Sequence, residues 1–562
     1  MFIDASALPR NTIVDADLCI VGAGPAGIAL ATELRRSGLQ VVLLESGGLN
    51  EETSERGQPD SKSVFEGHRG LWTTRRFGGN ANRWLVDAGI GPNHLRLITL
   101  SAADFDRRPW IPNSGWPLTL EELRPFYTRA QSWFELPEWH YGPGYWEDQG
   151  NRRLPLQNSG LRTSMFQFAD KNVVLTKHRD LIGASGGINC YFNATATRLE
   201  MNEAGNRITA VHTLPKPGLE VTFRARTFVL AQGGLATPQL LLSSTDRQAN
   251  GIGNQHDLVG RYFMDHPLLF GGTLTPTSRK LIDRMALYDL RRIGGTSGMG
   301  HLQLTDETLR GEPCVNISTI LFPRRSMSRR RELGFRASQR VREALHKRGR
   351  LRKRDLVAML YGLDGVAQQY NDRLRNPISH LGIGGWSKTN APSQRLDHFE
   401  VLHQAEQPPR YDNRVRLGEE RDDLGNRRIE IQWRWHDRDV ALVEKAQDIL
   451  ARELKRSGVG EFSIRRPMEI KTSSTTHFSG TTRMHDDPRE GVVDRNCRVH
   501  GVDNLFISGS SVFPTGGYAN PTLTIVALSL RLADRIRQEA GVNGGPLRGR
   551  QVLPSAREVS QD

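Results

Sequence analysis

The chain has 562 residues, too many for one compact core, so we expect two domains with the chain crossing between them more than once. Hydrophobic residues make up 37% of it, and no apolar run approaches the roughly 18 residues of a membrane-spanning helix, which argues against a membrane span. Most of the net charge of +14 lies in residues 324–354, where 14 Lys or Arg stand against two Glu, a net +12. No nucleic-acid motif accompanies this basic stretch, so we expect no nucleic-acid partner.

The basic stretch has several explanations. Parts of it, such as residues 338–350, follow a helical pattern, and a solvated helix face would account for the charge. An acidic partner, an electron acceptor or an anionic membrane surface would account for it equally.

The N-terminal residues bear on the cellular location, and the cysteines bear on metal sites and disulfides. Residues 1–11 lack the basic and apolar regions of a secretory signal, which favours a cytoplasmic protein. The cysteines are widely spaced, without CxxC or CxxCH, so we predict no metal site, no disulfide framework and no covalent haem. They are Cys19, Cys190, Cys314 and Cys497.

A strand, a glycine turn, a helix and a second strand follow each other from residue 17. The apolar run 17–21 ends in GAGPAG, and the second strand ends at Glu45. Gly22 permits a tight turn, Gly24 lets the backbone approach a pyrophosphate, and Gly27 lets helix and strand pack closely. Glu45 would accept hydrogen bonds from ribose hydroxyls and repel the 2'-phosphate of NADP. The unit predicts dinucleotide binding but does not separate FAD from NAD.

A glycine-containing loop and a helix start follow this unit. The loop RRFGGNANRW, residues 75–84, contains Gly78 and Gly79, which would let the backbone pass a flat ring system; an ordinary surface turn is the alternative. Thr119 and Glu122 have the spacing of a capping box, so we expect a helix to begin there.

The middle of the chain predicts a return to the nucleotide-binding sheet and then a second domain. Residues 188–213 read as paired strands, and 227–244 as a strand, a Gly-Gly turn and a helix. Residues 259–267 carry the chain away, and we expect His266 there to be structural. We therefore predict a cofactor domain from 1–100, 180–267 and 471–540, a substrate or cap domain from 101–179 and 268–470, and a disordered tail, 541–562.

The stretch from His477 to Ile536 combines a polar histidine segment, an apolar strand and a helix. His477 lies in HxxGTxxM, NLFISGSS spans 504–511, and YANPT spans 518–522. A histidine with a pKa near 6.5 can remove a hydroxyl proton at neutral pH. Pro521 suits the first turn of a helix spanning 521–536, whose positive end would face a bound cofactor.

Taken together and in this order, these motifs resemble the glucose-methanol-choline (GMC) family of flavin oxidoreductases. The resemblance rests on GAGPAG with Glu45, RRFGGNANRW, TFVLAQGGLATPQLL, VGRYFMDHP and the C-terminal stretch. GWPLTLEELRPFY and GGYANPT are most similar to the branch that contains pyranose oxidase and bacterial sugar and glycoside dehydrogenases.

The resemblance implies an α/β fold in which a Rossmann-like FAD-binding domain is assembled from discontinuous segments, beside a substrate domain with a mainly antiparallel sheet. It implies His477 as catalytic base and Asn520 as its partner. Arg83 stands where pyranose oxidases carry the histidine that links to FAD, so we expect non-covalent FAD. The implied cofactor-binding residues are Gly22, Gly24, Ala26, Gly27, Glu45, Arg76, Gly78, Gly79, Asn82, Ala196, Gly509, Ser510, Pro521 and Thr522.

The expected activity is oxidation of a CH–OH group of a sugar or glycoside, with hydride transfer to flavin N5 and proton transfer to His477. Asn520 would share the alkoxide charge. The electron acceptor would be oxygen, a quinone or a protein. Two alternatives remain: the same chemistry on a sterol, aromatic or aliphatic alcohol, or a non-catalytic flavin scaffold that docks through residues 324–354.

Overall fold

The computed structural model describes most of the chain. The described residues are 1–49, 62–63, 74–84, 86, 93–137, 139–325, 329–346, 351–367, 386–388, 391–468 and 475–541. None of the helices in this part is both long and apolar enough to cross a membrane.

The first sheet is built from segments that lie far apart in the sequence. Its inner strands pair in parallel, while β8 (Ala196–Met201) and β9 (Ile208–Lys216) extend one edge as an antiparallel pair. Near the middle, β19 (Leu505–Ile507) pairs in parallel with the end of β10 (Leu219–Leu230) and brings the C-terminal stretch into this sheet. In spatial order the strands are β1 (Phe2–Asp4), β7 (Ile188–Phe192), β3 (Val41–Leu44), β2 (Thr12–Val21), β10 (Leu219–Leu230), β9 (Ile208–Lys216) and β8 (Ala196–Met201), with β19 (Leu505–Ile507) on β10.

Helix α11 (Thr522–Glu539) packs on both α1 (Pro25–Leu34) and α3 (Leu120–Trp133). A partly buried network of ion pairs joins the three helices. Arg129 of α3 lies 2.9 Å from Glu33 of α1 and 2.6 Å from Asp534 of α11, and Arg537 also lies 2.9 Å from Glu33. The network ties the chain's first βαβ unit to its last helix.

Two predicted helix starts can be compared with the structure. The capping box before α3 is confirmed: the Thr119 hydroxyl accepts from the Glu122 N–H at 3.2 Å, and the Glu122 carboxylate accepts from the Thr119 N–H at 2.7 Å. α11 begins at Thr522, one residue later than predicted, because Pro521 is its N-cap residue.

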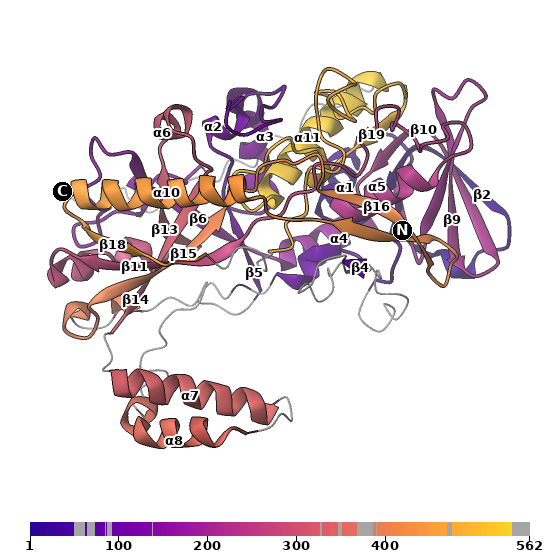
Figure 1. Cartoon of the computed structure of the whole chain (residues 1–562). Coiled ribbons are helices and arrows are strands. Elements are labelled where there is room, and N and C mark those ends of the chain that lie inside the picture. Colours follow the sequence, from indigo (N-terminus) through magenta and orange to yellow (C-terminus); the bar gives the residue numbers. More distant parts are fainter. Residues whose placement is uncertain are drawn as a thin grey trace, which may run out of the picture.

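The second sheet is antiparallel throughout, and the left half of Figure 1 shows α10 (Asp437–Arg456) lying across it. In order its strands are β18 (Gly460–Ile464), β11 (Leu268–Pro276), β15 (His398–Ala405), β14 (Ile317–Arg324), β13 (Thr296–Leu304), β6 (Leu161–Asp170) and β5 (His94–Leu97), with β12 (Leu290–Ile293) on β13. A parallel sheet beside an antiparallel one confirms the predicted fold class.

A smaller third sheet contains β16 (Arg414–Arg421), β17 (Arg427–Gln432) and β4 (Lys62–Ser63). β16 packs against α5 (Gly233–Ser243), so this part of the range 268–470 lies beside the first sheet. Conversely, β5 belongs to the second sheet, although its residues fall within the range 1–100 that we predicted for the cofactor domain. The domain boundaries stay a prediction, and all of the predicted disordered tail except Gly541 lies outside the described residues.

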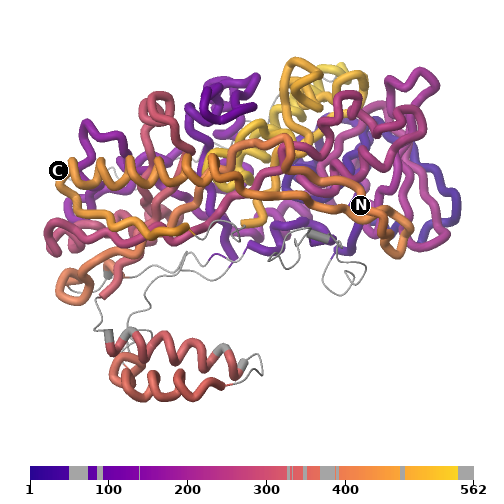
Figure 2. Tube along the Cα trace, viewed as in Figure 1, coloured from indigo at the N-terminus to yellow at the C-terminus, as the bar shows by residue number. Residues whose placement is uncertain are grey.

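The basic stretch forms α7 (Arg329–His346), and α8 (Lys353–Tyr361) packs on it. In Figures 1 and 2 this helix pair stands apart from the sheets. The remaining α-helices are α2 (Ala102–Phe105), α4 (His178–Gly183) and α6 (Asp306–Gly311). The short 3-10 helices are Ala5–Ala7, Gly79–Arg83, Gly144–Trp146, Arg279–Arg284, Ala286–Tyr288, Trp386–Lys388, Pro392–Gln394 and Ser510–Val512, and Val173–Lys177 is a π-helix.

Candidate active site

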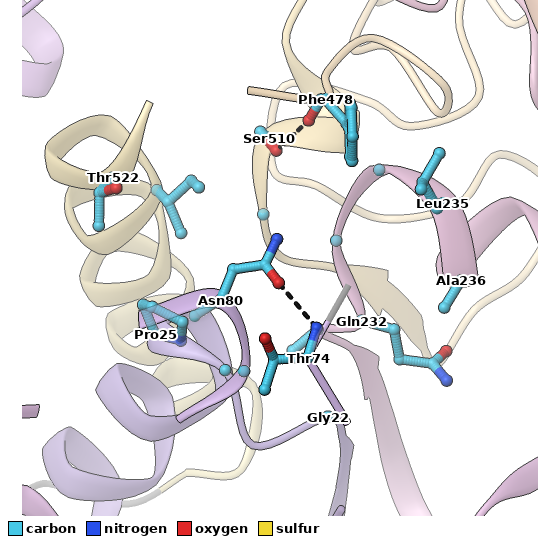
Figure 3. A pocket seen from close by; sticks show the side chains of 18 of the residues that line it. Gly22, Pro25, Thr74, Asn80, Gln232, Leu235, Ala236, Phe478, Ser510 and Thr522 are labelled. Carbon is cyan, nitrogen blue, oxygen red and sulfur yellow. Dashed lines mark hydrogen bonds between the residues drawn. The ribbon is translucent and has the colours of Figure 1, made fainter. Parts of the chain in front are cut away.

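A cavity of about 460 Å³ lies where the first sheet, the loop around residue 79 and the C-terminal stretch meet. In Figure 3, Pro25 at the start of α1 and Thr522 at the start of α11 lie on one side of it, and Gln232, Leu235 and Ala236 lie on the other. Two helix N-termini therefore open onto one cavity, an arrangement suited to a negatively charged ligand.

The glycine turn is shaped for a ligand on one side and for close packing on the other. A Cβ at Gly27 would lie 1.9 Å from the carbonyl oxygen of Gly22, so only glycine fits there. A Cβ at Gly24 would meet no protein atom within 4 Å, although Gly24 lines the cavity. The open space at Gly24 is where the backbone can approach a pyrophosphate.

Glu45 follows directly after β3, lines the cavity and is almost completely buried. Its carboxylate accepts from the N–H groups of Gly47 at 2.9 Å and Ala23 at 3.2 Å. Burial raises its pKa, and these two N–H groups oppose that shift. A held carboxylate at this place fits the predicted contact with ribose hydroxyls.

The loop with Gly78 and Gly79 rests directly on the glycine turn. The N–H of Gly78 donates to the carbonyl of Ala23 at 2.8 Å. The Asn82 amide donates to the carbonyls of Phe77 at 2.9 Å and Gly79 at 2.8 Å, so Asn82 holds the shape of the loop.

Most of the predicted site residues line the cavity. Gly27, Arg76, Gly78 and Asn82 are not among its lining residues. Those that line it are Gly22, Gly24, Ala26, Glu45, Gly79, Ala196, His477, Gly509, Ser510, Asn520, Pro521 and Thr522.

His477 and Asn520 face each other across the cavity. The Asn520 Nδ2 lies 3.5 Å from His477 Nε2. On the other side of the ring, His477 Nδ1 lies 2.9 Å from the Thr475 hydroxyl and 3.0 Å from His266 Nδ1. The structure thus brings together the two predicted catalytic residues and adds His266, which the sequence suggested only as a structural residue.

Asp265 fixes the backbone of both histidines. Its carboxylate accepts from the N–H groups of His266 at 2.7 Å and His477 at 2.8 Å. Asp265 is 1% exposed, so these bonds form away from water, where losing them is costly.

The side chain of Asn520 has a defined orientation. Its Oδ1 accepts from Arg96 Nη2 at 3.1 Å, from Arg96 Nε at 3.3 Å and from Gln404 Nε2 at 3.2 Å. Because all these partners are donors, they fix the oxygen on their side and leave the Nδ2 donor facing His477.

Arg96 is a buried cation whose hydrogen-bond partners here are neutral amides. It lies over the ring of Phe166, 4.3 Å from the centroid, and burial lowers its pKa to about 10. Burial, with help from His266 and Arg96, holds the pKa of His477 well below 6.5, and burial lowers that of His266 to about 3. Both imidazoles are therefore neutral at pH 7.

Arg96, Gln404, Thr475 and Asp265 were not predicted. Asp265 lies in VGRYFMDHP, residues 259–267, for which we predicted only that the chain leaves the cofactor domain there. Arg96 and Gln404 lie on β5 and β15 and carry no motif, so only the pairing of the second sheet reveals them.

The glycine turn gives a direct test of cofactor placement. We expect Gly24→Ala to keep its thermal stability but to weaken FAD binding at least about tenfold, because the methyl group projects into open space. We expect Gly27→Ala to lose about 1–3 kcal/mol of stability through overlap with Gly22. Gly186→Ala, with no atom within 4 Å and no lining role, is the control. FAD titration and thermal unfolding separate the effects; normal FAD affinity in Gly24→Ala would contradict the placement.

Two family models match the chain. Residues 409–529 match the model described as GMC oxidoreductase, and residues 17–255 match the one described as FAD dependent oxidoreductase. The two regions contain the C-terminal stretch up to Ser529 and the glycine turn, which meet at the cavity.

Known oxidoreductases resemble the chain, some along most of its length and one over a shorter region. The chain is 24% identical over 604 residues to the fructose dehydrogenase large subunit of Gluconobacter japonicus, covering 94% of this chain and 98% of that one. It is 37% identical over 121 residues to C-glycoside 3-oxidase of Arthrobacter globiformis, covering 21% and 22%. Its fold matches a crystal structure of formate oxidase with a TM-score of 0.51 at 16% identity, covering 95% and 100%.

The family models, the relatives and the geometry of the cavity agree with the resemblance seen in the motifs. The chain is thus an FAD-dependent oxidoreductase that acts on CH–OH donors, and its C-terminal region matches the GMC oxidoreductase model.

Proposed function

We propose that the protein oxidises a ring hydroxyl of a sugar or glycoside to a carbonyl, with His477 as the base and Asn520 as the donor to the substrate oxygen. One observation carries this proposal: a neutral imidazole and an oriented amide, 3.5 Å apart, line the cavity that the glycine turn also lines. FAD, when bound, supplies the acceptor for the hydride that leaves the carbinol carbon. The relatives named for fructose and a C-glycoside support a sugar-like substrate.

The hydrogen bonds around His477 favour the tautomer that a base needs. The Thr475 hydroxyl can donate to the carbonyl of His266 at 3.1 Å, which leaves its oxygen to accept the Nδ1 proton of His477. We therefore assign the proton to Nδ1 and the lone pair to Nε2, which faces the Asn520 amide 3.5 Å away. Nε2 then takes the hydroxyl proton as the C–H bond breaks.

Asn520 and Arg96 stabilise the charge that develops on the substrate oxygen. The amide N–H donates to that oxygen without competing for its proton, and Arg96 holds the amide in place. The nearby buried cation also favours negative charge at this position. The reaction balances because the alcohol becomes a carbonyl by losing one proton, which His477 accepts, and one hydride, for which bound FAD would be the acceptor.

The partners follow from this chemistry. We propose a small-molecule sugar or alcohol as the substrate and oxygen, a quinone or a protein as the electron acceptor. The basic stretch 324–354 adds a surface contact, for which an acidic partner and a membrane surface are the candidates.

Replacing the base tests the central role of His477. We expect His477→Ala to reduce the rate of anaerobic flavin reduction by about 100- to 10,000-fold, because the hydroxyl proton then has no acceptor. Stopped-flow absorbance with a sugar or glycoside substrate measures this rate. His256→Ala, an exposed histidine, is the matched control and should react like the parent. Equal rates for His477→Ala and the parent would remove His477 from this role.

The acid limb of the pH profile reports the charge of His477. Its pKa is lowered in the folded protein, so it stays neutral as the pH falls through 6.5 and is protonated only further down. We expect the limiting rate of flavin reduction to be unchanged between about pH 8 and about pH 6 and to decline below that. A half-maximal rate near pH 6.5 would contradict the lowered pKa of His477.

FAD should be held without a covalent bond, because Arg83, which lines the cavity, stands where the resemblance to pyranose oxidases puts the linking histidine. Acid precipitation of the holoenzyme should leave FAD in the supernatant and a colourless pellet. A yellow pellet that retains its flavin after washing would show a covalent link through another residue.

A further inference from the structure

The active site gives no role to the basic helix pair, α7 and α8. α7 and α8 stand apart from the sheets in Figures 1 and 2, and no residue of this pair lines the cavity. We define the hairpin as the described residues 329–346 and 351–367.

The hairpin is held together by its own contacts. A Cβ at Gly334 would lie 2.4 Å from Gly362 Cα, so the two backbones meet there without side chains between them. Arg331 lies 2.8 Å from Asp364, and Arg340 lies 2.9 Å from Asp355. These contacts define which faces of α7 and α8 turn toward each other and leave the opposite face of α8 uncovered.

The uncovered face of α8 is apolar. Val357, Leu360 and Tyr361 are 66%, 65% and 64% exposed, and their i, i+3, i+4 spacing places them side by side on one face. Of the 13 exposed large hydrophobic residues in the described chain, seven lie in the hairpin, a concentration that marks an interaction surface. These seven are Leu333, Leu345, Leu351, Val357, Leu360, Tyr361 and Leu363.

Cations flank the apolar face at both ends. Lys353 and Arg354 are exposed one turn before Val357, on the same side of the helix. At the other end the Arg330 guanidinium lies 5.7 Å from the centroid of the Tyr361 ring. Apolar and basic groups thus share one surface.

We propose that this face of α8 binds the surface of an anionic membrane, with its three apolar side chains at the boundary between headgroups and acyl chains and its cations on lipid phosphates. A lipid interface accepts an apolar helix face with flanking Lys and Arg without a matching groove. An acidic protein would satisfy the cations but would need a pocket for the apolar side chains. A second copy of the hairpin is disfavoured because both copies carry the same high positive charge.

Vesicle sedimentation of the full-length holoenzyme tests this proposal. We expect binding to vesicles of phosphatidylcholine with phosphatidylserine, little binding to phosphatidylcholine alone, and loss of binding as salt is raised. The triple variant Val357→Ser, Leu360→Ser, Tyr361→Ser should bind the anionic vesicles at least about tenfold more weakly. It should keep its FAD content and thermal stability, because all three side chains are exposed.

A matched control and a competing ligand give the contradicting outcomes. Ile13→Ser, Leu181→Ser, Phe270→Ser replaces three exposed hydrophobic residues elsewhere and should bind vesicles like the parent. No binding of the parent to anionic vesicles overturns the proposal. So does unchanged vesicle binding by the hairpin variant, or binding of parent and hairpin variant alike to poly-glutamate in preference to vesicles, which identifies an acidic partner. Flavin reduction is measured separately, so failure here leaves the proposed oxidation untouched.

Discussion

The Asp265 carboxylate fixes the geometry on which the active site depends. It accepts from the backbone N–H groups of His266 and His477, which lie 211 positions apart along the chain, and so joins the segment around residue 266 to the C-terminal stretch. Because the carboxylate and both N–H groups are away from water, each bond is costly to lose. The ring of His477 can meet Asn520 only while these two segments stay together, and His266 and Thr475 then complete its surroundings.

A second constraint comes from the antiparallel sheet. Arg96 and Gln404 reach from β5 and β15 to the oxygen of Asn520, so the substrate-side sheet sets the orientation of an amide that precedes α11. Burial, with a smaller effect of the nearby Arg96 cation, lowers the pKa of His477 and keeps the base unprotonated, and the cation also favours negative charge on a reacting oxygen. Both sheets therefore contribute to one reaction centre.

The parts of the site that depend on local sequence could be predicted, and those that depend on tertiary pairing could not. Gly24, Gly27 and Glu45 follow from one βαβ unit whose geometry is fixed by neighbouring residues. His477 and Asn520 were identified by resemblance, and the structure places them together. Arg96 carries no motif, because its role comes from the pairing of β5 with β6 rather than from its own segment. For the same reason the helix in the basic stretch was foreseen, but not the exposed apolar face of α8, since exposure depends on what packs against a helix.

The central claim is that this cavity oxidises a sugar-like CH–OH group. The most direct measurement is anaerobic titration of the purified holoenzyme with a panel of sugars, glycosides and simple alcohols, following the flavin absorbance and identifying the product. The account predicts that a sugar or glycoside bleaches the flavin and yields one equivalent of the corresponding carbonyl compound. Bleaching only by sterol, aromatic or aliphatic alcohols would contradict the sugar assignment, and a flavin that dithionite reduces but no alcohol does would contradict the reaction itself.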